Sequence, residues 1–524
     1  MSIDCDQNLI DVPAARSEKT GFECRQKAGP AEWGGLAVLA LPTALLGLDV
    51  TLLYLALPAL AADLKPSSTQ ALWIMDAYGF MIAGFLITMG TVGDRIGRRR
   101  LLMIGSAAFG LASVLAAYST SAGMLIAARA VLGLAGATLM PSTLALISNM
   151  FPDARERSLA IGVWATMFAL GMAAGPLVGG ILLERFWWGS AFLVAVPVVA
   201  VVLISAPLLL PEYRARKSGR FDLLSVMLSL AAILPVIYFV KESAKAGLSL
   251  GTVAALMLGV VFGIVFVRRQ RLLSDPLLDV GLFRNGAFSV ALSILLIGLV
   301  AVGGAMLLVT QYLQLVMGLA PVAAGLWLGP PALMMLVAGV AAPLLARRVR
   351  PGFVMAGALG LSAVGYALLA LLPHMAGIEL VVAGYSLVYL GLGTIAALGT
   401  DLVVSTAPPE KAGSASAMSE TVQELGVAVG VATLGSLTTA VYRSAILEHI
   451  PADLPAGVVR AAEDSLWAVS SASEQVPQSL VDHAKAAFVS GLSVSATVAM
   501  IGIVALAVLS AVALRHIGII GGDQ

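Results

Sequence analysis

Long apolar stretches, separated by short polar segments, run through this chain from residue 35 to residue 514. A helix needs roughly 20 mainly apolar residues to cross the hydrocarbon core of a membrane. By this criterion the pattern predicts an all-α membrane protein with fourteen membrane-spanning helices. The predicted spans lie at 35–61, 72–92, 101–118, 123–148, 159–183, 190–210, 222–240, 248–267, 288–316, 322–345, 352–372, 379–405, 413–440 and 488–514.

The composition supports a membrane protein, because 59% of the 524 residues are hydrophobic and only 12% are charged. The mean hydropathy of +0.96 lies far above that of a soluble domain. A net charge of +1 provides no broad basic surface, so nothing indicates a nucleic-acid partner.

Basic residues indicate which side of the membrane each loop faces. If the N-terminus is cytoplasmic, most of the 31 Lys and Arg residues fall in cytoplasmic segments, including the clusters at 95–100 and 347–350. Cytoplasmic loops carry an excess of Lys and Arg. We therefore predict that both termini are cytoplasmic and that the number of spans is even.

The spacing of the spans predicts two six-helix halves and two additional helices. We expect a cytoplasmic tail at 1–33, an N-terminal half at 34–211, the additional helices at 212–270 and a C-terminal half at 286–516. Transporters built from parallel halves bind substrate between them, near the midplane of the bilayer. The hydrophilic loop at 441–487 is expected to be extracellular and to form a short helical hairpin over the outer mouth.

Four acids interrupt the apolar spans: Asp49, Asp76, Glu420 and Glu424. An ionised acid in hydrocarbon costs about 2.5 to 3.5 kcal/mol, so each is a candidate for proton or cation coupling. Glu420 and Glu424 are four residues apart and share one helical face. Two neighbouring acids in an apolar cavity are not expected to be ionised together. Helix capping or packing is the alternative role for Asp49.

Two further sets of charged residues are candidates for a role in transport. Asp94, Arg95 and Arg98 lie in the short turn after the second span, where they form a candidate latch that breaks and reforms as the halves move. Simple anchoring at the cytoplasmic surface is the alternative. Arg129 lies deep within the fourth span and needs acceptors there. A structural ion pair or backbone ligand and a role in proton coupling are equally open for it.

The fifth span contains glycines at helical four-residue spacing beside a proline. Its residues are Gly171, Gly175, Pro176, Gly179 and Gly180. Small residues at this spacing allow close helix packing, and proline removes one backbone hydrogen bond and bends the helix.

Aromatic rings and methionine sulfur are the side chains expected to bind varied lipophilic cations. Candidates for the wall of a substrate cavity are Trp73, Tyr78, Trp164, Phe168, Met306, Tyr312 and Trp327. Each of them has a lipid-facing or packing role as its alternative.

The sequence contains no sign of a nucleotide, metal or other cofactor. It has no G-x-x-x-x-G-K-[ST] phosphate loop, and its four His residues stand singly, without ligand spacing. We therefore expect neither an ATP-driven pump nor a metalloprotein.

These motifs, in this order and at these spans, resemble the major facilitator superfamily. The glycine and proline motif of the fifth span resembles its proton-driven antiporters. The stretches Leu48–Thr51, Trp73–Tyr78 and Ser419–Gly426 resemble the first, second and thirteenth spans of its fourteen-span drug:proton antiporters. The resemblance covers the chain from about residue 33 to residue 515.

This resemblance implies the major facilitator fold and a proton-coupled antiporter in a bacterial plasma membrane. It implies export of hydrophobic, mainly cationic drugs, dyes and quaternary ammonium biocides, with coupling by Asp49 and Glu420. The partners implied are these small molecules, protons and the lipid bilayer, and we expect a monomer. Some relatives have an acid in the tenth span, but 322–346 contains no Asp or Glu, which weakens the expectation for large dications.

Two other functions are compatible with the same sequence. One is export of a lipid or cell-envelope metabolite, with drug export as a side activity. The other is a membrane sensor or enzyme, for which no catalytic set of residues is present.

Overall fold

The computed structural model describes residues 28–519 except 215–221, 274–275, 277, 279, 376, 408–411, 449, 451–453 and 472–475. Helices make up nearly all of this described part, which contains no strand. The predicted cytoplasmic tail lies almost entirely outside the described residues.

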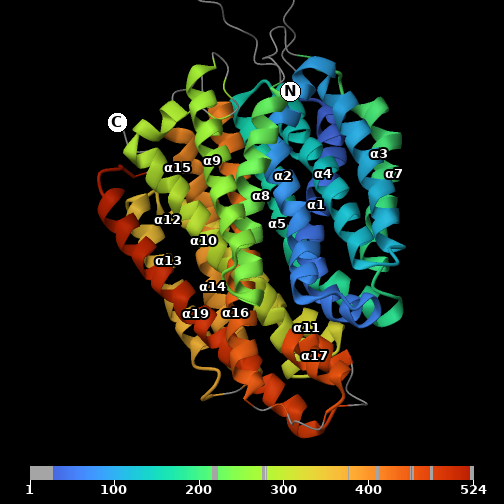
Figure 1. Ribbon diagram of the computed structural model, residues 1–524. Helices are drawn as coiled ribbons and strands as arrows, with labels where there is room; N and C mark the ends of the chain where they lie inside the picture. Colours follow the sequence, from blue (N-terminus) through green and yellow to red (C-terminus); the bar gives the residue numbers. More distant parts are fainter. Residues whose placement is uncertain are drawn as a thin grey trace, which may run out of the picture.

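The helices fall into an N-terminal group, a linking pair and a C-terminal group (Figure 1). The N-terminal group contains α1 (Pro30–Leu64), α2 (Ser68–Ile96), α3 (Arg98–Ala117), α4 (Ala122–Met150), α5 (Ala154–Arg185), α6 (Ser190–Leu193) and α7 (Ala195–Leu209). The linking pair is α8 (Leu223–Ala246) and α9 (Leu250–Leu272). The C-terminal group contains η1 (Val280–Arg284), α10 (Gly286–Gln311), η2 (Tyr312–Val316), α11 (Pro321–Trp327), α12 (Gly329–Leu345), α13 (Pro351–Ala370), α14 (Ile378–Thr394), η3 (Ile395–Gly399), α15 (Thr400–Ser405), α16 (Ala412–Leu447), α17 (Ala456–Asp464), α18 (Leu466–Ser471) and α19 (Gln478–Ala513).

Among the described residues, 13 helices are long and apolar enough to cross a membrane. Several of them combine elements, such as Pro321–Ala346, which joins α11 and α12, and Ile378–Ser405, which joins α14, η3 and α15. The 29-residue helix α2 is not among the 13. The all-helical membrane fold is thus confirmed, whereas the count of fourteen spans stays a prediction.

The N-terminal and C-terminal groups repeat one packing pattern. In the N-terminal group α1 packs on α5, α2 on α4, and α3 on α7. In the C-terminal group the corresponding pairs are α10 with α16, α12 with α14, and α13 with α19. The same first-to-fifth, second-to-fourth and third-to-sixth pairing in both groups is the arrangement that a duplicated six-helix unit produces.

The linking helix α8 fills the space between the two groups on one side of the molecule. Phe80 of α2, Ile237 of α8, and Ala428 and Ala432 of α16 form a small buried cluster there. Helix α9 packs on α8 and leaves most of its surface exposed. A largely apolar, exposed helix at this position is suited to contact lipid.

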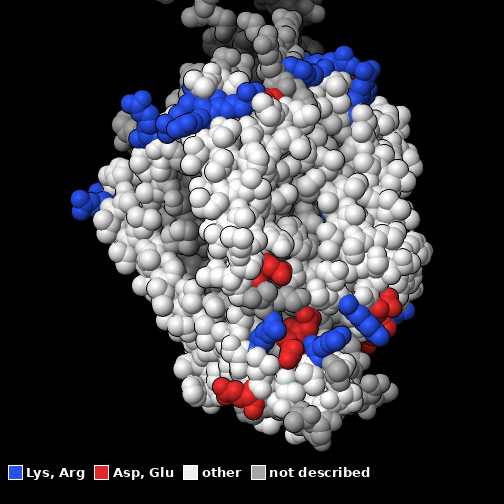
Figure 2. All heavy atoms as spheres, in the orientation of Figure 1, with Lys and Arg blue, Asp and Glu red and all other residues white. Residues whose placement is uncertain are grey.

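Basic residues gather at the end of the bundle where α1 begins and α19 ends (Figures 1 and 2). Several of them hold helix ends together there. The Arg99 Nη1 donates to the carbonyl oxygen of Leu210 at 2.9 Å, and the Arg350 Nη1 donates to that of Arg515 at 2.8 Å. The middle of the visible face is almost free of charged side chains in Figure 2, as expected for a surface in contact with hydrocarbon.

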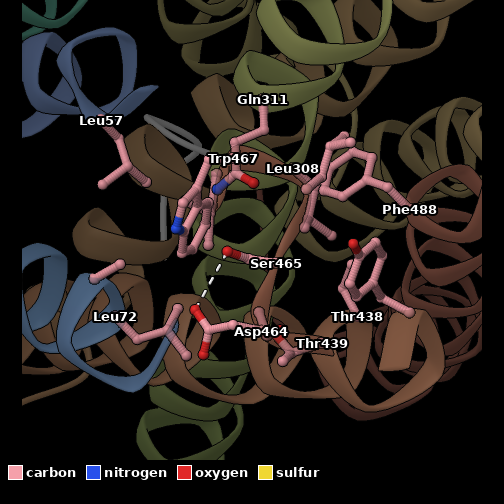
Figure 3. A pocket seen from close by; sticks show the side chains of 15 residues that line it. Leu57, Leu72, Leu308, Gln311, Thr438, Thr439, Asp464, Ser465, Trp467 and Phe488 are labelled. Carbon is pink, nitrogen blue, oxygen red and sulfur yellow. Dashed lines mark hydrogen bonds between the residues drawn. The ribbon is translucent and has the colours of Figure 1, made fainter. Parts of the chain in front are cut away.

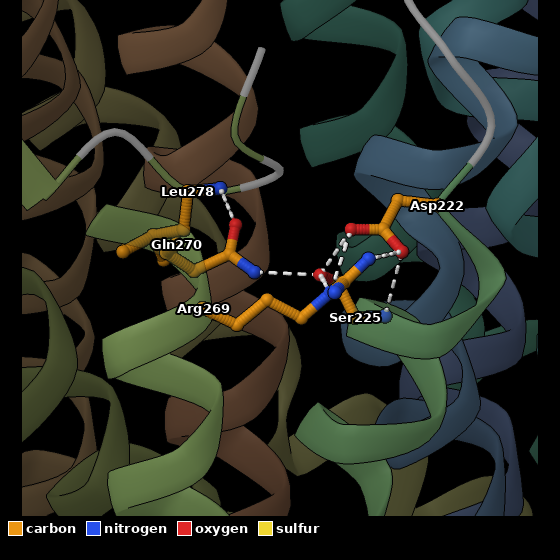
Figure 4. A network of polar contacts seen from close by, with 5 residues as sticks. All are labelled: Asp222, Ser225, Arg269, Gln270 and Leu278. Carbon is orange, nitrogen blue, oxygen red and sulfur yellow. Dashed lines mark hydrogen bonds and ion pairs between the residues drawn. The ribbon is translucent and has the colours of Figure 1, made fainter. Parts of the chain in front are cut away.

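A polar network at this basic end connects α8 to α9 (Figure 4). Asp222 caps α8 by accepting from the Ser225 amide at 3.1 Å. It also accepts from Arg269 at the end of α9, from Nε at 3.2 Å and from Nη2 at 2.9 Å. Gln270 donates to the Ser225 hydroxyl at 2.7 Å and accepts from the Leu278 amide at 3.1 Å, which ties the segment toward α10 to the same point.

The pKa of Asp222 lies below its ordinary value. Burial acts to raise this pKa, but the hydrogen bonds from Arg269 and Ser225 and the Arg269 charge outweigh burial. A carboxyl group with a lowered pKa in the folded state contributes stability above its unfolded pKa and loses it as the pH falls through the folded value.

We predict that Asp222→Ala lowers the free energy of unfolding by about 1 to 3 kcal/mol, because a helix cap and a charged hydrogen-bond pair are both lost. Since the Arg269 side chain is 33% exposed, solvent screening places the loss toward the lower end of this range. The measurement is the melting temperature of the purified protein in detergent. The deficit should be constant near neutral pH and shrink as the pH falls below about 4, because the wild-type carboxylate is then protonated first in the unfolded state and, at lower pH, in the folded state.

The matched control is Arg271→Ala, which removes an exposed arginine from the same end of α9. This variant should have the melting temperature of the wild type. Equal melting temperatures of the wild type and Asp222→Ala at neutral pH would show that this network does not stabilise the contact between α8 and α9.

Candidate functional site

An ion pair between Arg129 and Asp49 lies inside the N-terminal group. The Arg129 Nη1 is 2.8 Å from the Asp49 Oδ2, and the two side chains are only 3% and 12% exposed. The Arg129 Nε donates to the backbone oxygen of Ile74 at 3.2 Å. The guanidinium carbon also lies 4.4 Å from the centre of the Tyr78 ring. Arg129 thus connects α4 to α1 and to α2. Its guanidinium finds hydrogen-bond acceptors in the Asp49 carboxylate and the Ile74 carbonyl.

A glycine places α4 close enough to α2 for these contacts. A methyl group at Gly133 would overlap the backbone oxygen of Tyr78. Because Gly133 is one turn from Arg129 on α4, this close approach brings the guanidinium to the Ile74 carbonyl and the Tyr78 ring. The local sequence Arg129-x-x-x-Gly133 therefore supplies the charge and also the small residue that lets α4 approach α2.

The acids of α16 lie on the C-terminal side of this ion pair. Glu420 and Glu424 are half-buried and close enough to interact electrostatically with each other. Glu424 also interacts electrostatically with Asp49. Helix α16 lies against α2 here, since a methyl group at Gly79 would be 3.2 Å from the Ala428 Cβ. Acids from the two ends of the sequence are therefore brought together at the interface between the two groups.

Asp76 lies deeper than its position near the start of α2 suggests. Its side chain is 1% exposed, two turns from the start of the helix. It interacts electrostatically with Tyr54 of α1. Of the four predicted coupling acids, Asp76 is thus buried, and Asp49, Glu420 and Glu424 are half-buried.

The glycines of α5 pack against α1. A methyl group at Gly171 would overlap the Ala44 backbone oxygen, and one at Gly175 would overlap the Thr51 hydroxyl. At Gly179 it would lie 3.1 Å from the Leu52 Cγ. The Thr51 hydroxyl also donates to the Met172 oxygen at 3.0 Å, so this seam holds the helix that carries Asp49.

The end of the same motif reaches the C-terminal group. A methyl group at Gly180 would lie 2.7 Å from the Val322 Cα of α11, and one at Gly325 of α11 would overlap the Pro176 oxygen. The sequence predicted close packing at these glycines but not that Gly180 would contact the other group.

The candidate latch is described only in part. The Asp94 side chain lies outside the described residues, and Arg95 is exposed. Arg98 is buried, with its Nη1 donating to the Pro141 oxygen of α4 at 3.4 Å. A residue that the sequence did not single out, Glu212, accepts from the Arg99 amide at 3.2 Å.

The seven candidates for the substrate wall lie in different environments. Tyr78 contacts Arg129, as described above. Trp73 packs edge-on against Phe80 beside α8, and Trp164 donates to the Thr143 hydroxyl at 3.0 Å. Phe168 is half-buried, Met306 and Tyr312 are buried, and Trp327 is 38% exposed.

A small cavity lies at the end opposite the basic residues, under the short helices α17 and α18 (Figure 3). Its lining includes Leu57 and Leu72 from the N-terminal group and Thr438, Asp464 and Trp467 from the C-terminal group. The volume of about 30 Å³ is room for one or two waters. Drug-sized ligands need about 300 to 1,000 Å³, so this cavity is not the substrate chamber.

Helices α17 and α18 come from the loop 441–487 and connect the two groups. The Asp464 carboxylate accepts from the Ser68 amide at 3.0 Å and from the Ser68 hydroxyl at 3.2 Å, at the start of α2. The Tyr442 hydroxyl donates to the Ala462 oxygen at 3.0 Å and holds α17 on α16. With the contact between α5 and α11, these bonds hold the two groups together at this end.

A bundle of two similarly packed groups of membrane helices is typical of membrane transporters. Residues 39–431 match the model of the Major Facilitator Superfamily, and the chain belongs to this superfamily. It is a multi-pass protein of a bacterial plasma membrane, as predicted.

The chain is similar in sequence to several drug resistance proteins. It is 43% identical over 488 residues to the multidrug efflux pump LfrA of Mycolicibacterium smegmatis, covering 92% of this chain and 96% of that protein. It is 34% identical to the methyl viologen resistance protein SmvA of Salmonella typhimurium, covering 88% and 94%. These relatives confirm the predicted drug:proton antiporter family.

A solved structure of similar fold is a bacterial homologue of the human lysosomal transporter Spinster, in an inward-facing conformation. The TM-score is 0.64 at 15% identity, covering 93% of this chain and 98% of that one. At this identity the likeness shows the fold alone.

We predict that Gly175→Ala destabilises the protein by about 1 to 3 kcal/mol, because the added methyl group pushes α1 and α5 apart at Thr51. The measurement is the melting temperature in detergent. Gly162→Ala is the matched control on the same helix, since a methyl group there meets nothing within 4 Å. The control should be neutral or slightly stabilising; equal effects of the two changes would refute the close contact.

A second prediction concerns the ion pair. Arg129→Gln leaves Asp49 as an unpaired buried charge and should cost about 3 to 5 kcal/mol of stability. The double variant Asp49→Asn with Arg129→Gln removes both charges and should recover a large part of this loss. Additive losses in the melting temperatures of the three variants would show that the two residues act independently.

Proposed function

We propose that this protein is a proton-coupled antiporter that exports hydrophobic, mainly cationic drugs, dyes and quaternary ammonium biocides from the bacterial cytoplasm. The observation that carries the proposal is the Arg129–Asp49 ion pair, which lies within electrostatic reach of Glu424 on α16. The printed names of the relatives, a multidrug efflux pump and a methyl viologen resistance protein, support the same substrate class.

Exchange follows from competition for buried carboxyl groups. An apolar chamber favours the protonated form of a carboxyl group, whereas a bound cation favours the ionised form. Arg129 occupies one oxygen of Asp49, so protonation of Asp49 would release the guanidinium, and ionisation would recapture it. Glu420 and Glu424 repeat the competition on the C-terminal side, where a lipophilic cation can neutralise the acid that a proton has left.

Alternating exposure of this site converts the competition into export. When the site faces outward, protons are taken up and the cation leaves; when it faces the cytoplasm, protons leave and the next cation binds. Inward movement of a proton gains about 2.3 kcal/mol per 100 mV of membrane potential. The potential and the pH gradient together therefore favour outward movement of the drug.

The proposal includes a topology of fourteen spans, with α2 counted with the 13 other helices. The divisions proposed are the tail 1–33, the halves 34–211 and 286–516, and the additional helices at 212–270. Both termini then lie in the cytoplasm with the basic residues, and the protein acts as a monomer.

Contacts at the two ends would open in turn during the cycle. At the outer end the bonds between Ser68 and Asp464, and the packing of Gly180 on Val322, must separate for release. At the cytoplasmic end the proposed latch of Asp94, Arg95 and Arg98 forms when the site faces outward. When two packed groups rock against each other, contacts at one end open as contacts at the other end close.

The test is transport by inside-out membrane vesicles with an acidic lumen. Ethidium uptake into wild-type vesicles should draw protons out of the lumen and should stop when a proton uncoupler is added. In Asp49→Asn and Glu420→Gln vesicles both fluxes should fall at least about tenfold, which corresponds to about 1.4 kcal/mol.

Asp401→Asn is the control, because this acid is exposed and lies near the end of a span. It should transport like the wild type. Ethidium uptake that is indifferent to uncouplers would refute proton coupling. Variants that lose drug export but still move a neutral lipid downhill would favour an exporter of lipids or envelope metabolites.

A further inference from the structure

Three polar side chains, here named the polar clamp, join α16 to the start of α15 inside the C-terminal group. The Ser419 hydroxyl of α16 donates to the Thr400 hydroxyl of α15 at 3.3 Å. The Gln423 Nε2 shares its hydrogens between the same Thr400 oxygen at 3.4 Å and the hydroxyl and backbone oxygens of Ser419 at 3.3 Å each. Ser419 is fully buried, and Thr400 and Gln423 are half-buried. None of the three was a candidate from the sequence.

The polar clamp and two of the coupling acids occupy the same turns of α16. Ser419 and Gln423 are four residues apart, so both lie on one face of the helix. Glu420 and Glu424 each directly follow one of them, which places the acids on a neighbouring face, turned by about 100°. The rotation of α16 that directs one face toward α15 therefore also decides where the two carboxyl groups point.

The face of α16 that carries the acids is directed at the N-terminal group. Ala428 continues this face by one turn, and a methyl group at Gly79 of α2 would lie 3.2 Å from its Cβ. On another face α16 packs closely on α10, since a methyl group at Gly430 would overlap the Val300 backbone oxygen. Apolar packing has no preferred direction, whereas hydrogen bonds do. The polar clamp therefore adds a directional restraint to the packing of α16.

A π-helical turn lies directly before the Thr400 hydroxyl. The turn is η3 (Ile395–Gly399), which joins α14 to α15. A π turn inserts one residue into a helix and shifts the residues after it by about 100° around the axis. It packs on α10, where a methyl group at Gly399 would lie 2.9 Å from the Leu295 Cδ2. Such turns are frequent at functional sites, and this one sets the face on which Thr400 meets α16.

We propose that Thr400, Ser419 and Gln423 are positioning residues for transport, because their hydrogen bonds hold α16 in the rotation that directs Glu420 and Glu424 at the interface between the two groups. The proposal rests on the function proposed above, in which these acids exchange protons for cations. The polar clamp acts through the acids and not by contact with the drug. When it is loosened, the acids turn into different surroundings, and the pH dependence of the exchange changes with them.

The test is the pH dependence of transport by purified protein in liposomes, with tetraphenylphosphonium as substrate. Thr400→Val keeps the shape of the side chain and removes its hydroxyl. The pH of the half-maximal initial rate should move by at least about 0.5 unit, which is about a threefold change in proton affinity. Thr400→Ser keeps the hydroxyl and should have the wild-type midpoint. A smaller amount of active protein lowers the maximum rate but not this midpoint, so the measurement separates positioning from a loss of stability.

A second pair of variants tests whether the three residues act together. Gln423→Leu should move the midpoint in the same direction as Thr400→Val, and the double variant should move it no further, because both changes break one network. Ser419→Ala is a smaller change that decides the matter if Gln423→Leu does not fold. The matched control on α16 is Thr433→Val, since this hydroxyl donates to backbone oxygens of its own helix at 2.7 and 3.5 Å. The control should keep the wild-type midpoint.

The outcomes separate the polar clamp from the wider function. If wild-type protein moves no tetraphenylphosphonium against a proton gradient, the antiporter function fails, and the positioning role falls with it. If wild type is active and Thr400→Val and Ser419→Ala fold with the wild-type midpoint, the polar clamp is refuted. An equal shift in Thr433→Val or in Thr400→Ser would also refute it, because the shift would then not depend on the bonds between α15 and α16.

Discussion

The ion pair of Arg129 and Asp49 is the interaction on which the rest of this structure depends. Two opposite charges inside a membrane protein are tolerable only when each satisfies the other, and here they meet at 2.8 Å with backbone and aromatic support. The pair joins three helices of the N-terminal group. It also places a carboxylate and a guanidinium beside the acids of α16, so any proton or cation that enters the interface alters a balance of charges already present.

Close helix packing makes this arrangement possible. Gly171 and Gly175 bring α5 against the helix of Asp49, Gly133 brings α4 against α2, and Gly180 brings α5 against α11. Helices that touch through backbone atoms slide and rock as units, because few side chains need to rearrange. In the proposed cycle, bonds at both ends of the bundle would decide which side is open, including the contact of Asp464 with Ser68. The small residues that allow the close packing would also allow the movement proposed for transport.

The sequence predicted the helices well, because membrane thickness sets the length of each apolar segment. It also singled out the acids and the arginine that lie deep in the spans, since burying a charge in hydrocarbon is costly. Which faces of the helices meet was not predictable. A membrane helix is apolar all round, so no polar stripe indicates its rotation, and the 80-residue separation of Asp49 and Arg129 hides their contact. For this reason Trp73 was a candidate for the substrate wall but packs beside α8.

The central claim is that a cation and protons compete for the same buried carboxyl groups. Its most direct test is proton release by purified protein in a weakly buffered detergent solution when tetraphenylphosphonium is added. The account predicts that wild type releases protons on binding, and that binding weakens as the solution is made more acidic. Removal of the acids at positions 49 and 420 should abolish the release. Binding of the cation without proton release, and with equal strength at acidic and neutral pH, would contradict the account.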